Sequence, residues 1–361
     1  MNTSVSPLNP RRRHAELVVK NTPRMAWREG DQSAWRAQWR AQLERTLGLD
    51  RLLAQERPPL AVRTLWRREH ELGVIEKIIF TAEPGSDVPA YLCVPHGFEA
   101  PGPFFICVQG HSTGMHKSIA VDLHDNEKPI QTEGDRDYAL GCMRRGVAAL
   151  CIEQRAFGER ADFPSDNKWV NRCHNPAMHA LMLGRTLLAE RIYDVDRGID
   201  YLMTRDDVDP ARLGLMGNSG GGTVSTFAGG LLDRVTHVMP SCSFSTFADS
   251  IMSIDHCCCN YVPGLLDWGE AAEVAGLIAP RPLVIVNGRD DPIFPIDASA
   301  REFARLQKIY AAAGAADLCH HVVCDGGHRF YADQAWAAML PHLGLATAAG
   351  RTGSPSQFSL K

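Results

Sequence analysis

The chain has 361 residues, of which 45% are hydrophobic and 22% charged, with a formal net charge of −4. This is an ordinary globular composition, and it excludes a collagen-like, coiled-coil or wholly disordered chain. The slightly acidic balance favours neither nucleic acid nor an anionic membrane as a partner. The longest apolar runs, such as residues 104–108, are far shorter than the roughly 20 residues of a membrane span, so we expect no membrane partner.

The N-terminal region, residues 1–70, is predicted to be a helical extension that packs on the main domain. Within it, residues 31–49 carry apolar side chains at spacings of four, which predicts one apolar stripe on a helix: Trp35, Trp39, Leu43 and Leu47. Residues 71–345 are assigned to the main domain. The last stretch, residues 346–361, is rich in Gly, Ser and Thr and is predicted to be a loose tail.

Short apolar runs alternate with longer helical patterns along the main domain. Eight runs have the length of strands: residues 74–80, 90–94, 104–108, 147–152, 213–216, 235–239, 283–286 and 320–324. This pattern predicts an α/β fold with a mainly parallel eight-stranded sheet and helices on both faces. The first two runs flank a turn signal at residues 84–87, which indicates an antiparallel hairpin. Residues 176–204 are predicted to form one long helix.

The cysteines are numerous and scattered. There are 11, an odd number, and the N-terminus has no apolar core of a secretory signal, so we expect reduced thiols and a cytoplasmic location. The run Cys257-Cys258-Cys259 follows His256 and could suggest a metal cluster. Adjacent residues, however, cannot easily point three sulfurs at one ion, and zinc sites normally use spaced ligand pairs. We therefore predict buried or pocket-lining thiols, and no metal.

The most informative segment is Gly217-Asn218-Ser219-Gly220-Gly221, which contains the pattern G-x-S-x-G. It follows an apolar strand run and precedes a predicted helix, which is the setting of a nucleophile elbow. In that turn the serine adopts a strained backbone conformation that lifts its hydroxyl above the sheet edge, and flanking glycines avoid collisions with neighbouring backbone. The pattern predicts Ser219 as a nucleophile, with the amides of the following helix directed at developing negative charge.

A serine hydroxyl needs a base, and the base needs an acid to orient it. In this strand layout the expected chain order is Ser, then Asp or Glu, then His. An acidic turn with Asp290 and Asp291 follows the strand run 283–286, and His328 lies in a loop after the last strand run. Two further histidines, at positions 320 and 321, lie within that strand, so we favour His328 as the base. Because an imidazole must be neutral to accept a proton, activity should fall at acidic pH.

These loops resemble the acid and histidine loops of α/β-hydrolase esterases, through Gly288-x-x-Asp-x-x-x-Pro295 and Gly326-Gly327-His328. The matching register makes Asp291 the acid and Asp290 a solvated neighbour. Residues 153–159, 183–202, 255–257 and 261–264 extend the likeness over most of residues 74–343. The chain most resembles the acetyl xylan esterase and cephalosporin C deacetylase-like members of the dienelactone hydrolase clan. Dienelactone hydrolases proper use a cysteine nucleophile, and Ser219 therefore favours the esterase branch.

The oxyanion hole should combine the amide after the nucleophile, at Gly220, with an amide from the loop after the third strand run. That loop contains Gln109, Gly110 and His111, where the superfamily usually has His-Gly. The choice of donor among these three residues stays open.

The resemblance implies a serine hydrolase that cleaves short-chain acyl esters, acetyl above all, through an acyl-enzyme, with a small-molecule ester as substrate and no cofactor. Four aromatic residues are candidates to stack on a sugar or line an acyl pocket, with core or lid packing as the competing interpretation: Trp169, Phe244, Tyr261 and Trp268. An acylaminoacyl- or dipeptidyl-type peptidase and a non-catalytic binding protein on the same fold are the alternatives. Relatives of this family often assemble, so the resemblance also allows a homo-oligomer.

Overall fold

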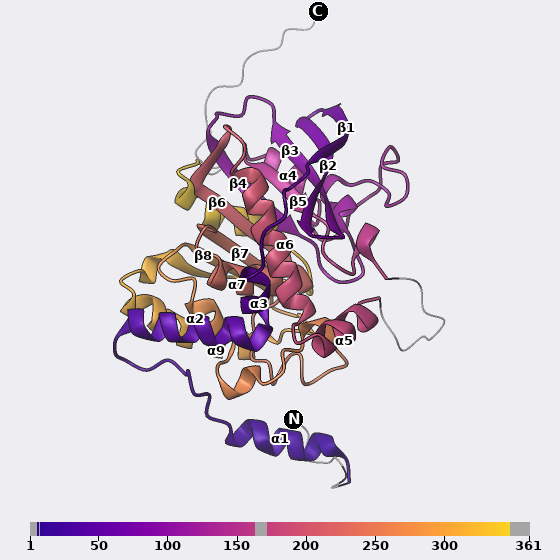
Figure 1. Ribbon diagram of the computed structural model, residues 1–361. Helices are drawn as coiled ribbons and strands as arrows, with labels where there is room; N and C mark the ends of the chain where they lie inside the picture. The colour runs from indigo at the N-terminus through magenta and orange to yellow at the C-terminus, as the bar shows by residue number, and fades with distance from the viewer. Residues whose placement is uncertain (1–5, 7, 163–171, 347–361) are drawn as a thin grey trace, which may run out of the picture.

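The computed structural model describes residues 6, 8–162 and 172–346. Its centre is a single mixed sheet in the order β1-β2-β3-β5-β4-β6-β7-β8-β9 (Figure 1). The strands are β1 Arg63–His70, β2 Gly73–Glu83, β3 Ser86–Pro95, β4 Gly102–Val108, β5 Ala148–Ile152, β6 Val208–Asn218, β7 His237–Ser241, β8 Leu283–Gly288 and β9 Cys319–Cys324. Every pairing from β5 to β9 across the sheet is parallel, whereas β1, β2, β3 and β5 pair antiparallel.

The predicted strands are all present, including the hairpin between β2 and β3, but the sheet has nine strands rather than eight. The additional strand is β1, which pairs antiparallel with β2. Its sequence, RTLWRREH, is charged and mostly exposed, so it lacks the apolar run by which the other strands were predicted. Charged side chains are typical of edge strands, where they discourage pairing with another chain. Residues 1–70 thus contribute a strand as well as helices.

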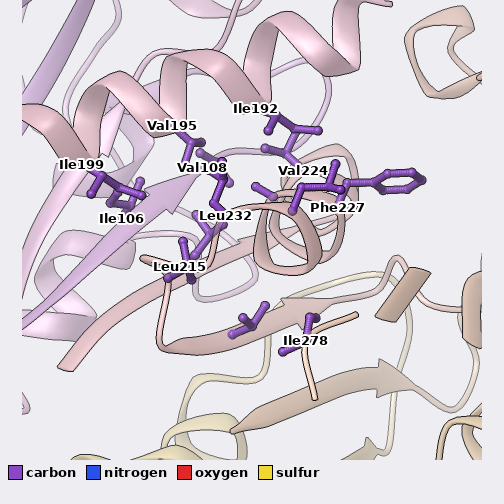
Figure 2. Close-up of a cluster of buried hydrophobic side chains, with 14 of the residues drawn as sticks. Ile106, Val108, Ile192, Val195, Ile199, Leu215, Val224, Phe227, Leu232 and Ile278 are labelled. Atoms are coloured by element: carbon purple, nitrogen blue, oxygen red, sulfur yellow. The ribbon is translucent and has the colours of Figure 1, made fainter. Parts of the chain in front are cut away.

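Helices cover both faces of the sheet (Figure 1). Their bounds are α1 Pro10–Lys20, α2 Gln32–Leu47, α3 Leu49–Leu53, α4 Tyr138–Met143, α5 His174–Met182, α6 Leu187–Leu202, α7 Gly220–Leu231, α8 Ala271–Gly276, α9 Ile296–Ala312 and α10 Ala332–Met339. Side chains alternate between the two faces along each strand: Ile106 and Val108 of β4 belong to the larger core cluster, and Phe105 to the smaller one. The larger cluster lies under α6 and α7 (Figure 2). The smaller one contains residues of α4 and α10, so the sheet is buried on both sides.

The region predicted as one helix over residues 176–204 forms two helices, α5 and α6. Gly184 between them has a φ of 75°, a conformation that glycine adopts without steric cost and that ends a helix. Thr186 then begins the next helix, because its hydroxyl accepts a hydrogen bond from the Ala189 amide at 3.0 Å. The apolar spacing continued across this break, and the pattern therefore did not reveal it.

Helix α2 lies on the main body through its apolar stripe. Trp39 is fully buried, and its indole nitrogen donates to the Glu273 carbonyl oxygen at 3.0 Å. On the same helix, Arg36 and Arg40 both pair with Asp233. These contacts give the tryptophan stripe a packing role. Within the described ranges, no helix is long and apolar enough to cross a membrane.

Candidate active site

Ser219 occupies the sharp turn between β6 and α7, with φ 58° and ψ −122°. This is a left-handed conformation that a serine rarely adopts. Its amide donates to the Ser241 carbonyl oxygen at 2.9 Å, which ties the turn to the end of β7. A Cβ atom at Gly217 or Gly221 would collide with the Val108 carbonyl oxygen of β4. The glycines of the motif are therefore required by the close approach of β4, and the strained turn is the geometry of a nucleophile elbow.

His328 and Asp291 meet above the ends of the neighbouring strands β9 and β8. The His328 Nδ1 lies 2.8 Å from Asp291 Oδ2. The other carboxylate oxygen accepts the amides of Ile293 at 2.9 Å and Phe294 at 3.2 Å. Burial by itself would raise the pKa of Asp291, but the hydrogen bonds from His328 and the two amides outweigh it and hold the pKa below its usual value. The ionised carboxylate orients the imidazole and leaves Nε2 as the nitrogen that can exchange a proton.

The end of β7 links this pair to the serine turn. The Ser241 hydroxyl donates to Asn218 Oδ1 at 2.9 Å and contacts the Arg329 carbonyl oxygen at 3.3 Å. The neighbouring Cys242 thiol donates to the same carbonyl at 3.2 Å. Among the described residues, the Ser219 hydroxyl makes no direct hydrogen bond to His328. In hydrolases without substrate this bond is often long and tightens in the Michaelis complex.

The residues that competed for the acid and base positions have other partners. Asp290 is exposed, and its amide donates to the Gly326 carbonyl oxygen at 2.9 Å. His320 lies 2.8 Å from His342 Nε2, and His321 Nε2 lies 3.0 Å from Asn287 Oδ1. The structure therefore brings Asp291, and not its neighbour, to His328.

The loop after β4 lies against the serine turn. A Cβ atom at Gly110 would lie 2.9 Å from the Asn218 carbonyl oxygen and 3.2 Å from Ser219 Cβ, and one at Gly220 would lie 2.7 Å from His111 Cε1. Only glycines allow these approaches. The backbone of this loop at Gly110 therefore lies close to Ser219, and the His111 ring lies close to Gly220.

The side chain of Gln109 does not face the serine. It is buried, and its amide nitrogen donates to Ser118 Oγ at 2.7 Å and to the Arg136 carbonyl oxygen at 2.9 Å. Its backbone carbonyl oxygen accepts a hydrogen bond from the side-chain amide of Gln154. Gln109 thus holds the loop in place, and only its backbone amide is left as a candidate oxyanion donor.

A buried acid behind the site joins two loops. Glu153, just after β5, accepts the amides of Met115 at 3.0 Å and Glu159 at 3.1 Å, and burial raises its pKa to about 7. Nearby, Arg155 makes an ion pair with the buried Asp194 of α6 at 2.8 Å. The segment 153–159, which resembles a family motif, therefore positions the loop after β4 on the body of the protein.

The four candidate pocket aromatics have different surroundings. Trp169 lies outside the described residues. Phe244 is buried and lines a cavity together with Phe294, whose ring stacks on His328 at a centroid distance of 6.0 Å. Tyr261 is 41% exposed, and its hydroxyl donates to the Ile251 carbonyl oxygen at 2.9 Å. Trp268 packs against the N-terminal segment, where the Arg24 guanidinium lies 4.9 Å from its ring centroid. Phe244 is therefore the candidate that the structure connects to His328.

A row of rings that the sequence did not reveal runs from His111 to His328. The His111 and His256 centroids are 5.7 Å apart, His256 and Phe294 are 6.3 Å apart, and Phe294 then stacks on His328. Burial lowers the pKa of His256, which favours the uncharged ring. No spacing rule relates position 256 to 111, and only the folded chain shows the contact.

A cluster of sulfur and nitrogen atoms lies on the other side of His111. The donor atoms of His111, Cys173, Cys257 and Cys259 all lie within 4.8 Å of one another. The His111 Nε2 is 3.0 Å from Cys259 Sγ, and the Sγ atoms of Cys257 and Cys259 are 3.2 Å apart. Hydrogen bonds from the neighbouring thiols, together with the positive charge of Arg191, hold the pKa of Cys259 well below its usual range. The grouping does not follow from the Cys257–Cys259 run alone, because two ligand-type residues come from distant segments.

Comparison with known proteins finds similarity to a protein named as a hydrolase. No family model matches it. It is 28% identical over 298 residues to a Bacillus subtilis protein named "Putative hydrolase YtaP". The matched region covers 82% of this chain and 94% of that protein.

Solved structures of carbohydrate esterases share the fold. A "putative acetyl xylan esterase" from Bacteroides fragilis superposes with a TM-score of 0.69 at 16% identity, covering 90% of this chain and 84% of that one. A glucuronoyl esterase from Solibacter usitatus gives a TM-score of 0.65 at 16% identity, covering 90% and 96%. The predicted α/β-hydrolase fold is confirmed.

Proposed function

We propose that this protein is a carboxylic ester hydrolase that works through an acyl-enzyme, with Ser219 as nucleophile, His328 as base and Asp291 as the orienting acid. The observation that carries the proposal is the 2.8 Å hydrogen bond between His328 and the buried Asp291, next to a serine held in a nucleophile elbow. A buried carboxylate, an imidazole and a strained serine are the three parts that this chemistry requires.

The reaction proceeds in two steps. The Ser219 hydroxyl attacks the ester carbonyl carbon while His328 Nε2 takes its proton, and Asp291 stabilises the imidazolium that forms. The tetrahedral intermediate then collapses, His328 returns the proton to the leaving alcohol, and the acyl group stays on the serine. Water, deprotonated by the same imidazole, hydrolyses the acyl-enzyme and releases the acid.

The negative charge of the tetrahedral intermediate needs donors that are already in place. The Gly220 amide opens helix α7, so the partial positive charge of the helix N-terminus faces the same point. Backbone amides of residues 109–111 supply the second donor in this proposal, and the tight approach of Gly110 to Ser219 supports it. Removal of one such donor typically lowers kcat by about 10²–10³.

For the substrate we propose a short-chain acyl ester, acetyl above all, of a carbohydrate or a similar alcohol. The sequence motifs that resemble acetyl xylan esterases support this choice, and so do the names of the structural neighbours, which are carbohydrate esterases. Phe294 stacks on His328 and lines a cavity with the buried Phe244, and these bulky rings support a small acyl group.

Covalent labelling tests the nucleophile directly. A fluorophosphonate probe should label the wild-type chain on the peptide that contains Ser219 and leave Ser219→Ala unlabelled, because only an activated serine reacts readily. A panel of p-nitrophenyl esters of graded acyl length, acetylated sugars and matched aminoacyl amides then tests the substrate class. Hydrolysis of the amides at rates matching those of the esters would favour a peptidase. Absence of labelling in the folded wild type would indicate a non-catalytic protein.

A further inference from the structure

We propose that His111, Cys173, Cys257 and Cys259 form a zinc site next to the nucleophile turn. Their four donor atoms lie within 4.8 Å of one another. In a tetrahedral site with Zn–S bonds of about 2.3 Å, ligand atoms are roughly 3.5–3.8 Å apart. Two of the separations, His111 Nε2 to Cys259 Sγ and Cys257 Sγ to Cys259 Sγ, are 3.0 and 3.2 Å, so small side-chain movements would give the ligand spacing of a bound ion. Three sulfurs and one imidazole form a common donor set of structural zinc sites.

The ligands come from three separate parts of the fold. His111 belongs to the loop after β4, Cys173 directly precedes α5, and the other two lie in the segment after β7. The converging donor atoms include the sulfurs of Cys257 and Cys259 but not that of Cys258, which lies 3.8 Å from the Cys173 carbonyl oxygen. Cys258 is therefore outside the donor group. An ion here would fasten three otherwise irregular segments to each other.

The charge around the cluster favours bound metal over neutral thiols. Arg191 of α6 is only 1% exposed, and its guanidinium donates to Cys259 Sγ at 3.2 Å and to Cys173 Sγ at 3.5 Å. It also donates to the Arg155 carbonyl oxygen, and it lies 4.3 Å from the Phe157 ring centroid. In the described part of the chain it makes no ion pair with a carboxylate.

A buried cation is costly unless an anion compensates it. Three thiolates around one Zn²⁺ leave one net negative charge, which the Arg191 guanidinium offsets. Protonated thiols would leave the guanidinium without a counter-charge. A disulfide between Cys257 and Cys259 would do the same and would also need an oxidant. For this reason we favour the metal site over a redox pair.

The ion would also determine the state of His111. The Nε2 atom of His111 faces Cys259, so it is this nitrogen that would bind the ion. The imidazole must then be neutral, with its proton on Nδ1. That nitrogen lies on the Gly220 side, 2.8 Å from the place where a Cβ of Gly220 would be. Zinc would thus lock the ring of a residue in the loop after β4 beside the first residue of α7. We assign it this positioning role and no step in ester cleavage.

Metal content tests the proposal without any assay of ester hydrolysis, so its failure is distinct from failure of the proposed function. The full-length protein, purified with a non-thiol reductant, is equilibrated with Zn²⁺ and passed into metal-free buffer. Elemental analysis should find one Zn²⁺ per chain. Replacement with Co²⁺ should produce thiolate-to-cobalt charge-transfer absorption. A folded wild-type protein that retains no Zn²⁺ and gives no such absorption overturns the proposal.

Cysteine variants provide matched controls. Cys257→Ser and Cys259→Ser should bind Zn²⁺ roughly tenfold or more weakly than wild type, whereas Cys258→Ser should bind it normally. Equal loss in all three variants would contradict the site. Detection by mass spectrometry of a native Cys257–Cys259 disulfide, with no metal bound, would favour the redox pair. If a variant fails to fold, the cobalt spectrum of the wild type still decides.

Discussion

Two histidines lie near Ser219, and the partners of their rings differ. His328 donates to Asp291, a buried carboxylate whose second oxygen accepts two backbone amides. His111 instead faces the sulfur of Cys259, beside a buried guanidinium. A carboxylate stabilises the protonated ring and prepares it to exchange protons, whereas a soft sulfur cluster suits a neutral ring that acts as a ligand. The partner atom therefore decides whether an imidazole takes part in chemistry or holds a loop in place.

The largest effect on activity should come from removing the Ser219 hydroxyl, which lies near both histidines. Ser219→Ala should lower kcat by about 10⁴–10⁶, because the nucleophile is lost while the rest of the site remains. Its free energy of unfolding should change by less than about 0.5 kcal/mol. Turnover of a short-chain p-nitrophenyl ester and thermal melting measure the two quantities. Wild-type turnover by the folded variant would contradict the assignment.

The carboxylate side of the comparison is tested at two adjacent positions. Asp291→Asn should lower kcat by about 10⁴, because the amide favours the wrong imidazole tautomer. The matched control, Asp290→Asn, should have little effect because that side chain is exposed. Steady-state kinetics of both variants gives the ranking, and the reverse order would move the acid by one residue. Zinc content should be the same in both variants, since neither residue touches the sulfur cluster.

The sulfur cluster around His111 is tested by removing the positive charge of Arg191, which contacts two of its sulfurs. Arg191→Gln should reduce the free energy of unfolding by about 3–5 kcal/mol, the usual cost of removing one partner of a buried charged group. Arg289→Gln, which removes an exposed pair with Asp325, should cost less than about 1 kcal/mol. Urea denaturation followed by circular dichroism measures both. Equal small losses would show that the buried sulfurs carry no negative charge.

The smallest expected effect concerns stability in acid. The pKa of Asp291 is lower in the folded protein than its usual 3.8, so its contribution to stability is present above that value and is lost as the pH falls through the folded pKa. Wild-type protein should therefore lose more stability than Asp291→Asn between about pH 5 and pH 2. Melting temperatures across this range give the difference. If the melting temperatures of the two proteins fell in parallel with pH, the Asp291 carboxylate would gain no stability from its hydrogen bonds.

Local patterns revealed much of the fold and of the proposed triad. Buried strands were visible as apolar runs because both faces of a parallel sheet are covered. The elbow at Ser219 was visible because a close backbone approach demands glycines at fixed positions. The acid and base loops follow strands directly, so the chain order alone placed them at one sheet edge. The edge strand β1 was missed because it is charged, and the break at Gly184 was missed because the apolar spacing continues across it.

The sequence by itself determined the α/β architecture, and it placed the proposed nucleophile and its proposed partners along the chain, since each depends on neighbouring residues or on a strand end. Only the tertiary structure decided which residues surround His111. Its partner Cys259 is 148 positions away, and a third segment supplies Cys173. No periodicity relates these positions, because the packing of irregular segments against α6 and the sheet edge brings them together. The cysteine run therefore looked unsuited to a metal, although the folded chain presents four converging donor atoms.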